Sequence, residues 1–227
     1  MRPQAMKNMT TKRLWAKFDK RRLAGLPRVV FEGRVIVVQT EVEAEKAVDY
    51  LLSQPLLGFD TETRPTFKPG RMNPVALLQV ATHDTCFLFR LNLMGITPSL
   101  VRLLADTSVT KVALSWKDDT HQLQRLCNFT LGDFVELQHY VRTFGIEDAG
   151  LQKLYGNVFG QKISKSQQLT NWEAEVLSEG QKRYAATDAW ACVRLYEELE
   201  RLRADGNWEL LKPQEEEAED TTQTENT

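Results

Sequence analysis

Short runs of apolar and β-branched residues recur along the chain between stretches of mixed polarity. Runs of about four to eight such residues, bounded by turn residues, are typical of strands. They cover residues 35–38, 56–62, 75–82, 86–91, 111–115 and 134–137. The runs between 56 and 91 are separated by Pro/Gly-rich and His-Asp segments, which predicts three neighbouring antiparallel strands.

Two stretches begin with a capping box, in which a Ser or Thr and a Glu or Gln three residues later bond each other's backbone N–H groups. Thr40 with Glu43 opens a helix that ends before Pro55, and Ser178 with Gln181 opens a longer one. With three further stretches, the expected helices cover residues 41–54, 98–105, 118–127, 149–159 and 179–204.

Charge is distributed unevenly, although the formal net charge is only −2. Residues 1–28 carry nine Lys and Arg against one Asp, whereas the end of the chain is acidic and poor in apolar residues. We therefore expect a basic N-terminal extension (1–28), a folded domain (29–206) and an acidic, disordered tail (207–227).

The basic extension also contains large apolar residues. Leu14, Trp15 and Phe18 indicate that part of it docks on the domain as a short helix. Its Lys and Arg side chains either contact phosphate groups or form ordinary solvated surface.

Composition excludes several classes of protein. With 42% hydrophobic and 26% charged residues, the chain is typical of globular proteins with a buried core. No apolar run approaches the roughly 18–20 residues of a membrane helix, and the first residues lack a signal sequence, so we expect a soluble, cytoplasmic protein. Cys86, Cys127 and Cys192 are widely spaced, which argues against a disulfide framework or a zinc finger.

A pair of carboxylates ends the strand expected over 56–62. In the segment GFDTET, Asp60 and Glu62 are two residues apart, so both side chains point to one side of a pleated strand. Two like charges side by side are unfavourable unless they titrate or bind a cation, and a hard divalent cation is the natural partner. The alternative is a solvated pair at a strand end.

Two more carboxylates lie in expected helices. Tyr184 and Asp188, in YAATDAW, are one turn apart on one helix face. Asp119 stands in the N-terminal turn of an earlier helix, four residues before Leu123. The alternatives are a tyrosine that only packs beside an exposed aspartate, and a helix cap made by Asp118 or Asp119.

Together the acidic segments resemble the tyrosine-bearing branch of the DEDD superfamily of 3′–5′ exonucleases, which contains ribonuclease D and the Werner-syndrome exonuclease domain. The resemblance extends from about residue 35 to residue 204. The residues that match the three motifs are Asp60 and Glu62, then Asp119, then Tyr184 with Asp188.

Residues around the motifs refine the resemblance. Arg183 stands where the sister branch carries a histidine, which excludes that branch. The segments 74–79 and 171–173 are similar to the Werner-type group. Two departures, Arg64-Pro65 after the first motif and Trp116 near the second, bear on how a terminal nucleotide is held.

The resemblance implies an RNase H-like (DnaQ-like) single domain, with a mixed five-stranded sheet flanked by helices. It implies metal-dependent hydrolysis of nucleic acid from the 3′ end to nucleoside 5′-monophosphates, with DNA slightly favoured. An RNA-trimming exoribonuclease and an inactive nucleic-acid-binding domain are the alternatives. The expected cofactors are two divalent cations, Mg²⁺ or Mn²⁺, held by the four carboxylates, with Tyr184 orienting the attacking water.

Contacts to the substrate must come from other residues, because a carboxylate cluster repels a polyanion. The partner expected from the resemblance is a single strand or a 3′ end, and no membrane. The candidates for substrate binding are Arg64, Lys68, Arg71, Lys162, Lys165, Gln168 and Trp172. Ordinary surface roles are the alternative for the basic residues.

Overall fold

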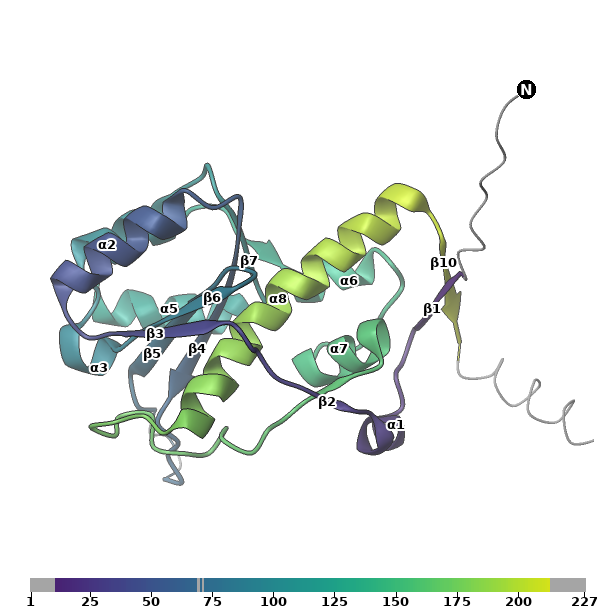
Figure 1. Ribbon diagram of the computed structural model, residues 1–227, viewed down its shortest axis with the longest axis horizontal. Helices are drawn as coiled ribbons and strands as arrows, with labels where there is room; N and C mark the ends of the chain where they lie inside the picture. The colour runs from purple at the N-terminus through teal and green to yellow at the C-terminus, as the bar shows by residue number, and fades with distance from the viewer. Residues whose placement is uncertain (1–10, 69, 71, 213–227) are drawn as a thin grey trace, which may run out of the picture.

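The computed structural model describes residues 11–68, 70 and 72–212 as an α/β fold with helices on both faces of a mixed sheet (Figure 1). The strands of this sheet are β3 Arg34–Val38, β4 Leu56–Thr63, β5 Val75–Ala81, β6 Thr85–Phe89, β7 Thr110–Ala113 and β8 Val135–Glu136. They lie in the order β3-β6-β5-β4-β7-β8. Strand β5 is antiparallel to β4 and β6, as expected, and the other neighbours are parallel.

The sheet contains six strands, so the expectation of five was wrong. The apolar run expected at 134–137 does form a strand, β8 at the edge of the sheet, where Val135 pairs with Val112 of β7. It has two residues, because the chain turns directly into helix α6 (Leu137–Arg142).

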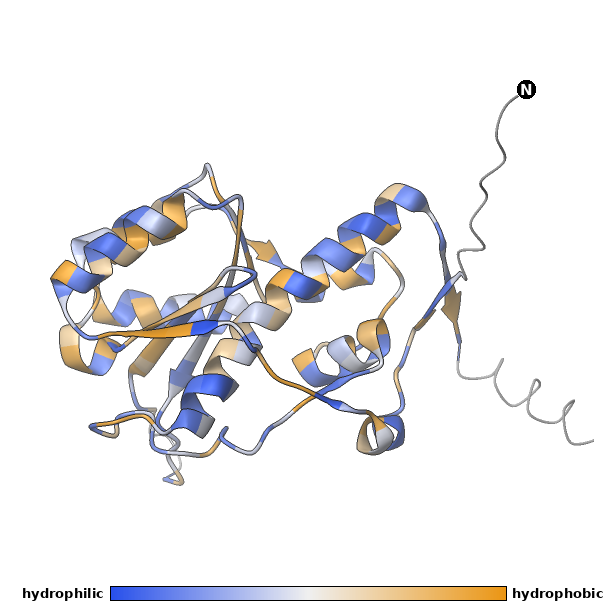
Figure 2. Cartoon of the chain, viewed as in Figure 1, coloured by the Kyte–Doolittle hydropathy of each residue, from blue (hydrophilic) through white to orange (hydrophobic). Residues whose placement is uncertain are grey.

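Helices α2 (Glu41–Leu52), α4 (Pro98–Ala105) and α5 (Trp116–Leu126) share a hydrophobic core with one face of the sheet. Helix α8 (Glu179–Asp205) crosses the other face, beside α7 (Leu151–Phe159). Figure 2 shows α8 hydrophilic at both ends and paler along its middle, where alanines meet the sheet. A short helix α3 (Leu91–Met94) follows β6.

Local signals set most helix ends. Both predicted capping boxes are formed, at Thr40 and at Ser178. Helix α8 ends at Gly206, whose φ of 64° lies in the left-handed region that glycine adopts readily. Within the described residues, no helix has the length and apolar content needed to cross a membrane.

The cap of α5 differs from both candidates considered for it. The N–H groups of Ser115 and Trp116 donate to the carboxylate of Glu136, at 2.8 and 2.7 Å. Helix α5 therefore begins at Trp116, and Asp118 and Asp119 lie within its first turn instead of capping it. A cap supplied by a residue about twenty positions away leaves no local pattern.

The two ends of the described chain pair with each other. Strand β1 (Lys12–Trp15) is parallel to β10 (Trp208–Leu211), and the two lie side by side in Figure 1. Leu14 is buried in the core beneath α8, so the extension docks through a strand instead of the expected helix. The expected disorder is wrong for Trp208–Leu211, while residues 1–10 and 213–227 lie outside the described part.

Two other short elements complete the N-terminal region. Helix α1 (Lys20–Gly25) contains no buried residue. Strand β2 (Arg28–Val29) pairs with β9 (Lys162–Ile163), which brings the segment before the sheet beside the segment that leads into α8. The N-terminal region thereby reaches the surroundings of the cleft described below.

Small residues let α8 approach β4 closely. A Cβ atom on Gly58 would lie 2.1 Å from the main-chain oxygen of Ala189 and 2.8 Å from Cγ2 of Val193. Since no residue with a side chain fits there, glycine at position 58 sets the depth of the helix. The neighbouring Asp188 is thereby carried toward the strand that bears Asp60.

Candidate active site

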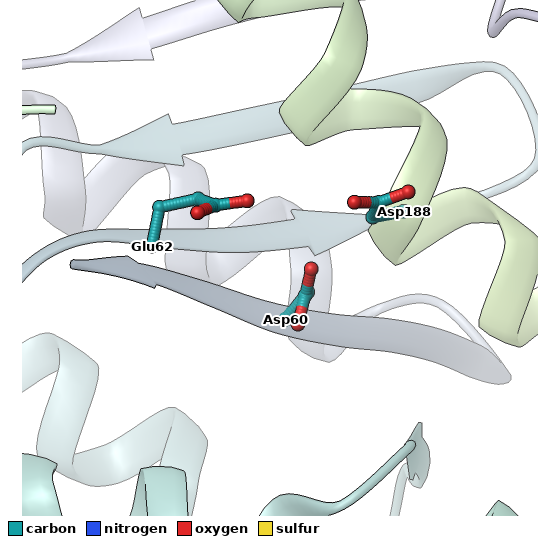
Figure 3. Close-up of side chains that lie close together, drawn as sticks. All are labelled: Asp60, Glu62 and Asp188. Atoms are coloured by element: carbon teal, nitrogen blue, oxygen red, sulfur yellow. The ribbon is translucent and has the colours of Figure 1, made fainter. Parts of the chain in front are cut away.

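Three carboxylates converge from two elements. Asp60 and Glu62 project from the same side of β4, and Asp188 projects from α8. One oxygen of each lies within 4.8 Å of the others (Figure 3). The sequence predicted this pairing of the first and third motifs, and the close contact at Gly58 explains how α8 achieves it.

Asp119 stands beside this trio and is not part of it. Its Oδ1 accepts a hydrogen bond of 2.5 Å from Oγ1 of Thr61. Because side chains alternate along a strand, Thr61 points to the side opposite Asp60 and Glu62, where α5 packs. Thr61 thus anchors Asp119 to the strand of the first motif, a role that our sequence analysis did not assign to it.

Burial gives these acids unusual protonation. The pKa values of Asp60 and Glu62 lie well above their ordinary range. The largest cause is the loss of hydration on burial, and the second is repulsion by the charges of the neighbouring carboxylates. Burial also raises the pKa of Asp188 to about 7 and that of Asp119 to about 6. The Tyr184 hydroxyl and Lys165 act against the rise at Asp188.

The donor set suits a hard divalent cation. It consists of carboxylate oxygens, the ligands that Mg²⁺ and Mn²⁺ prefer, and these oxygens lie close enough to repel one another. Cys192 also lines the cleft, but burial raises the pKa of its thiol and keeps it protonated, which makes it a poor ligand. The cluster is therefore a candidate site for a hard metal ion.

Tyr184 lies one helical turn before Asp188 and lines the same cleft. Burial and the neighbouring carboxylates raise the pKa of its hydroxyl, so the phenol remains a hydrogen-bond donor at neutral pH. Its ring lies 6.0 Å from that of Trp172, with 38° between the planes. The tyrosine therefore has a packed ring and a hydroxyl that faces acidic groups.

The cleft has a volume of about 250 Å³ and combines acidic, polar and apolar walls. Lys165 and Gln168, two of the residues predicted to bind substrate, line it together with Asp60, Glu62, Tyr184 and Asp188. Lys165 is exposed and supplies positive charge beside the carboxylates. These two residues stay predictions as substrate contacts.

The other predicted substrate residues have different surroundings. Trp172 was wrongly interpreted, because its side chain is fully buried against Tyr184 and does not reach the surface. Arg64 pairs with Glu173 at 3.1 Å, and Lys162 donates to a main-chain oxygen of α1. Lys68 is exposed in the loop after β4. Arg71 lies outside the described residues.

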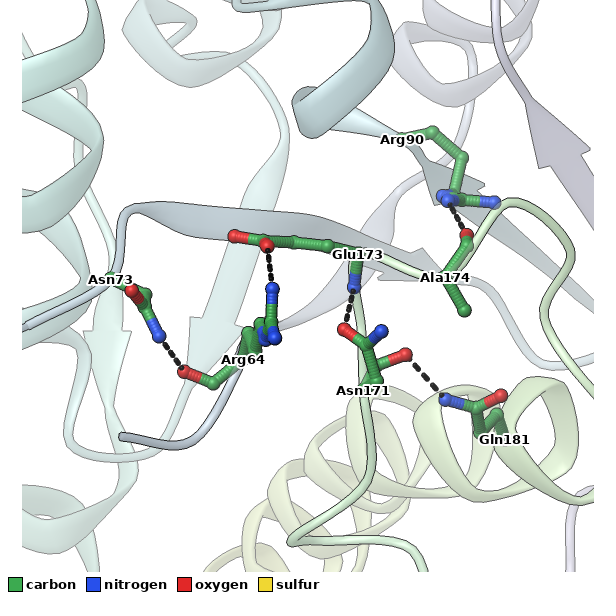
Figure 4. A network of polar contacts seen from close by, with 7 residues as sticks. All are labelled: Arg64, Asn73, Arg90, Asn171, Glu173, Ala174 and Gln181. Carbon is green, nitrogen blue, oxygen red and sulfur yellow. Dashed lines mark hydrogen bonds and ion pairs between the residues drawn. The ribbon is translucent and has the colours of Figure 1, made fainter. Parts of the chain in front are cut away.

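A network of polar contacts holds the loop that carries Trp172 (Figure 4). Gln181 donates to the main-chain oxygen of Asn171, and the buried Arg90 donates to those of Ala174 and Glu175. The pair between Arg64 and Glu173 ties the same loop to the end of β4. Arg90 therefore supports the packing of Trp172 on Tyr184. Nothing in the sequence around Arg90, which follows an apolar run, indicates this role.

Comparisons with known proteins relate this chain to exonucleases. Residues 35–203 match a family model described as 3′–5′ exonuclease. The bifunctional 3′–5′ exonuclease/ATP-dependent helicase WRN of Mus musculus is 33% identical over 153 residues, which cover 65% of this chain and 11% of that protein. A 3′–5′ exonuclease of Arabidopsis thaliana is 27% identical over 220 residues, or 89% of this chain and 76% of that protein.

Solved structures show the same fold. The Nibbler EXO domain of Aedes aegypti superimposes with a TM-score of 0.68 at 24% identity, covering 78% of this chain and 92% of that domain. Escherichia coli RNase D superimposes with a TM-score of 0.64 at 21% identity, covering 75% of this chain and 46% of that protein. The α/β architecture is thus that of exonuclease domains.

Proposed function

Because this chain belongs to the 3′–5′ exonuclease family, we propose that it hydrolyses nucleic acid from the 3′ end and releases nucleoside 5′-monophosphates. The observation that carries the proposal is the convergence of Asp60, Glu62 and Asp188 in one cleft with Tyr184. These residues come from the two motifs that are farthest apart in the sequence. Their meeting at one point is what a reaction centre requires.

We assign the chain to the tyrosine-bearing branch of the family. Tyr184 lines the cleft, one turn before Asp188, which supports this assignment. Arg183, at the position of the histidine in the sister branch, donates to the main-chain oxygens of Phe31 and Gly33 at 3.0 and 2.8 Å. These bonds fix Arg183 to the segment between β2 and β3 and leave Tyr184 as the ring facing the acidic cluster.

Two divalent cations, Mg²⁺ or Mn²⁺, complete the proposed site. Asp60, Glu62 and Asp188 would hold one of them, and Asp119 would help to hold the second from the α5 side. Such cations lower the pKa of an attacking water and stabilise charge on the phosphate and the leaving oxygen. Four carboxylates and two cations are close to neutral together, which offsets the repulsion among the acids.

The protein groups then orient the reactants. The raised pKa of Tyr184 makes its hydroxyl a poor base, so its role is to donate a hydrogen bond and position the attacking water. Lys165, at the edge of the cleft, would contact a backbone phosphate without reading sequence. We favour DNA slightly as the polymer, from the similarity of the flanking segments to the Werner-type group.

The test measures the release of labels from the two ends of a nucleic acid strand. Single-stranded DNA and RNA, labelled at the 3′ or the 5′ end, are incubated with the protein and Mg²⁺ or Mn²⁺. The proposal is supported if the 3′ label is released early as a mononucleotide while the 5′-labelled strand is still being shortened. EDTA should stop both processes. A folded protein that binds both polymers and degrades neither with either metal would instead be a binding domain.

A further inference from the structure

Gln79 is the direct cross-strand neighbour of Asp60. The antiparallel register of β4 and β5 places the two residues opposite each other, and residues paired in this way point to the same face with Cβ atoms about 4.5–5.5 Å apart. Leu77 and Ala81, two positions away on β5, pack in the core under α8. Alternation along the strand therefore also places Gln79 on the α8 face, beside the acidic cluster.

The carboxamide of Gln79 is buried and without a partner. Its side chain is 0% exposed, and neither Oε1 nor Nε2 has a hydrogen bond to the described residues. Leaving a buried donor or acceptor unbonded destabilises the folded chain, and buried polar groups in native proteins are normally bonded. Apart from Asp60, its nearest neighbours in the sheet on this face, Leu77, Ala81 and Leu88, are apolar.

An apolar residue of similar size would serve the packing of this face better. The buried polar group therefore calls for a hydrogen-bond partner. Asp60 is the closest candidate by register, and its carboxylate lies in a cluster with those of Glu62 and Asp188, with one oxygen of each within 4.8 Å of the others (Figure 3). A carboxylate that ligates a metal is generally oriented by a second hydrogen bond, made by the oxygen that does not contact the ion.

We propose that Gln79 is a positioning residue of the metal site, whose Nε2–H is donated to the carboxylate of Asp60 when cations are bound. Gln79 supplies a side-chain donor to this carboxylate. This role rests on the proposed function, since it requires the carboxylates to hold a cation. The unbonded amide of Gln79 is then a donor prepared for a ligating carboxylate.

Two variants test the role without relying on activity. Gln79→Leu and Gln79→Met keep the volume and remove the amide. Unfolding of each full-length protein is measured in EDTA, and Mn²⁺ binding is measured by titration calorimetry. We expect the metal-free variants to be at least as stable as the wild type, because an unbonded polar group is gone, while Mn²⁺ affinity falls about 10–100-fold.

Leu78→Met is the matched control. Leu78 is adjacent in β5 but packs on the opposite face, with α2, α4 and α5, so Mn²⁺ affinity should not change. Wild-type Mn²⁺ affinity in the Gln79 variants would overturn the proposal. Loss of metal-free stability in both variants would also overturn it, because the amide would then be bonded for the fold. A wild-type protein that binds no Mn²⁺ would instead refute the metal site itself.

Discussion

The main-chain oxygen of Ala189 lies 2.1 Å from the position that a Cβ atom would occupy on Gly58. Ala189 directly follows Asp188 in α8, and Gly58 lies two residues before Asp60 in β4. The distance between the first and third acidic motifs is therefore fixed by backbone packing. It does not depend on the carboxylates, which repel one another.

Gly58→Ala should push α8 away from β4. We expect a loss of about 1–3 kcal/mol in the free energy of unfolding, as for other overpacked cores, together with weaker Mn²⁺ binding. Denaturant unfolding and calorimetry measure the two effects. Gly25→Ala is the control, because a Cβ there meets no atom within 4 Å. Wild-type stability and Mn²⁺ affinity in Gly58→Ala would contradict this account of the packing.

Tyr184→Phe should reduce kcat by about 10–10³-fold and leave KM nearly unchanged, because the hydroxyl positions the attacking water and does not hold the substrate. The ring remains packed on Trp172, so the melting temperature should stay close to that of the wild type. Steady-state kinetics on a labelled strand measures both parameters. Full kcat in this variant would show that the tyrosine only packs.

Thr61→Val should release Asp119 from β4. The lost hydrogen bond involves a carboxylate, and such bonds contribute about 1.5–3 kcal/mol. We expect weaker binding of Mn²⁺ and a lower kcat, measured by titration calorimetry and by label release. Thr63→Val, in the same strand but without a bond to Asp119, is the control. Equal behaviour of the two variants would show that the bond to Asp119 has no function.

The metal-free protein should lose stability as pH rises. A carboxyl whose pKa is higher in the folded chain binds more protons when folded, so unfolding releases protons and becomes easier at higher pH. For Asp188 the window runs from its ordinary value of 3.8 to about 7. In EDTA, the melting temperature should therefore fall between about pH 4 and pH 7.

The control for this pH dependence is Asp188→Asn, which should have a shallower slope of melting temperature against pH, since one titrating group is gone. Mn²⁺ should stabilise the wild type more at the higher pH, because cations bind the deprotonated acids. Identical slopes for wild type and variant would contradict the assigned cause.

Local patterns account for much of the fold. The antiparallel strands β4, β5 and β6 follow from short apolar runs with turn residues between them, and the two capping boxes mark the starts of α2 and α8. The site was predictable where it depends on spacing within one element. Asp60 and Glu62 share a strand face, and Tyr184 and Asp188 are one helical turn apart.

The errors arose where distant segments meet. Trp172 lies in a polar stretch that gives no sign of its burial, and the loop that carries it is bonded by Arg90, more than eighty residues away, through the main-chain oxygens of Ala174 and Glu175. The pairing of β1 with β10 joins segments nearly two hundred residues apart, in regions whose charge suggested solvated ends. The bond between Thr61 and Asp119 likewise required knowing which helix covers the far face of β4.

If the buried carboxylates form a metal-dependent hydrolytic site, removal of one of them should abolish release of the terminal nucleotide. Wild type and Asp188→Asn are compared for single-turnover release of the terminal mononucleotide from a 3′-labelled strand with saturating Mn²⁺. We predict rapid release by the wild type and a rate lower by several orders of magnitude in the folded variant. Release at the wild-type rate by Asp188→Asn would contradict the claim.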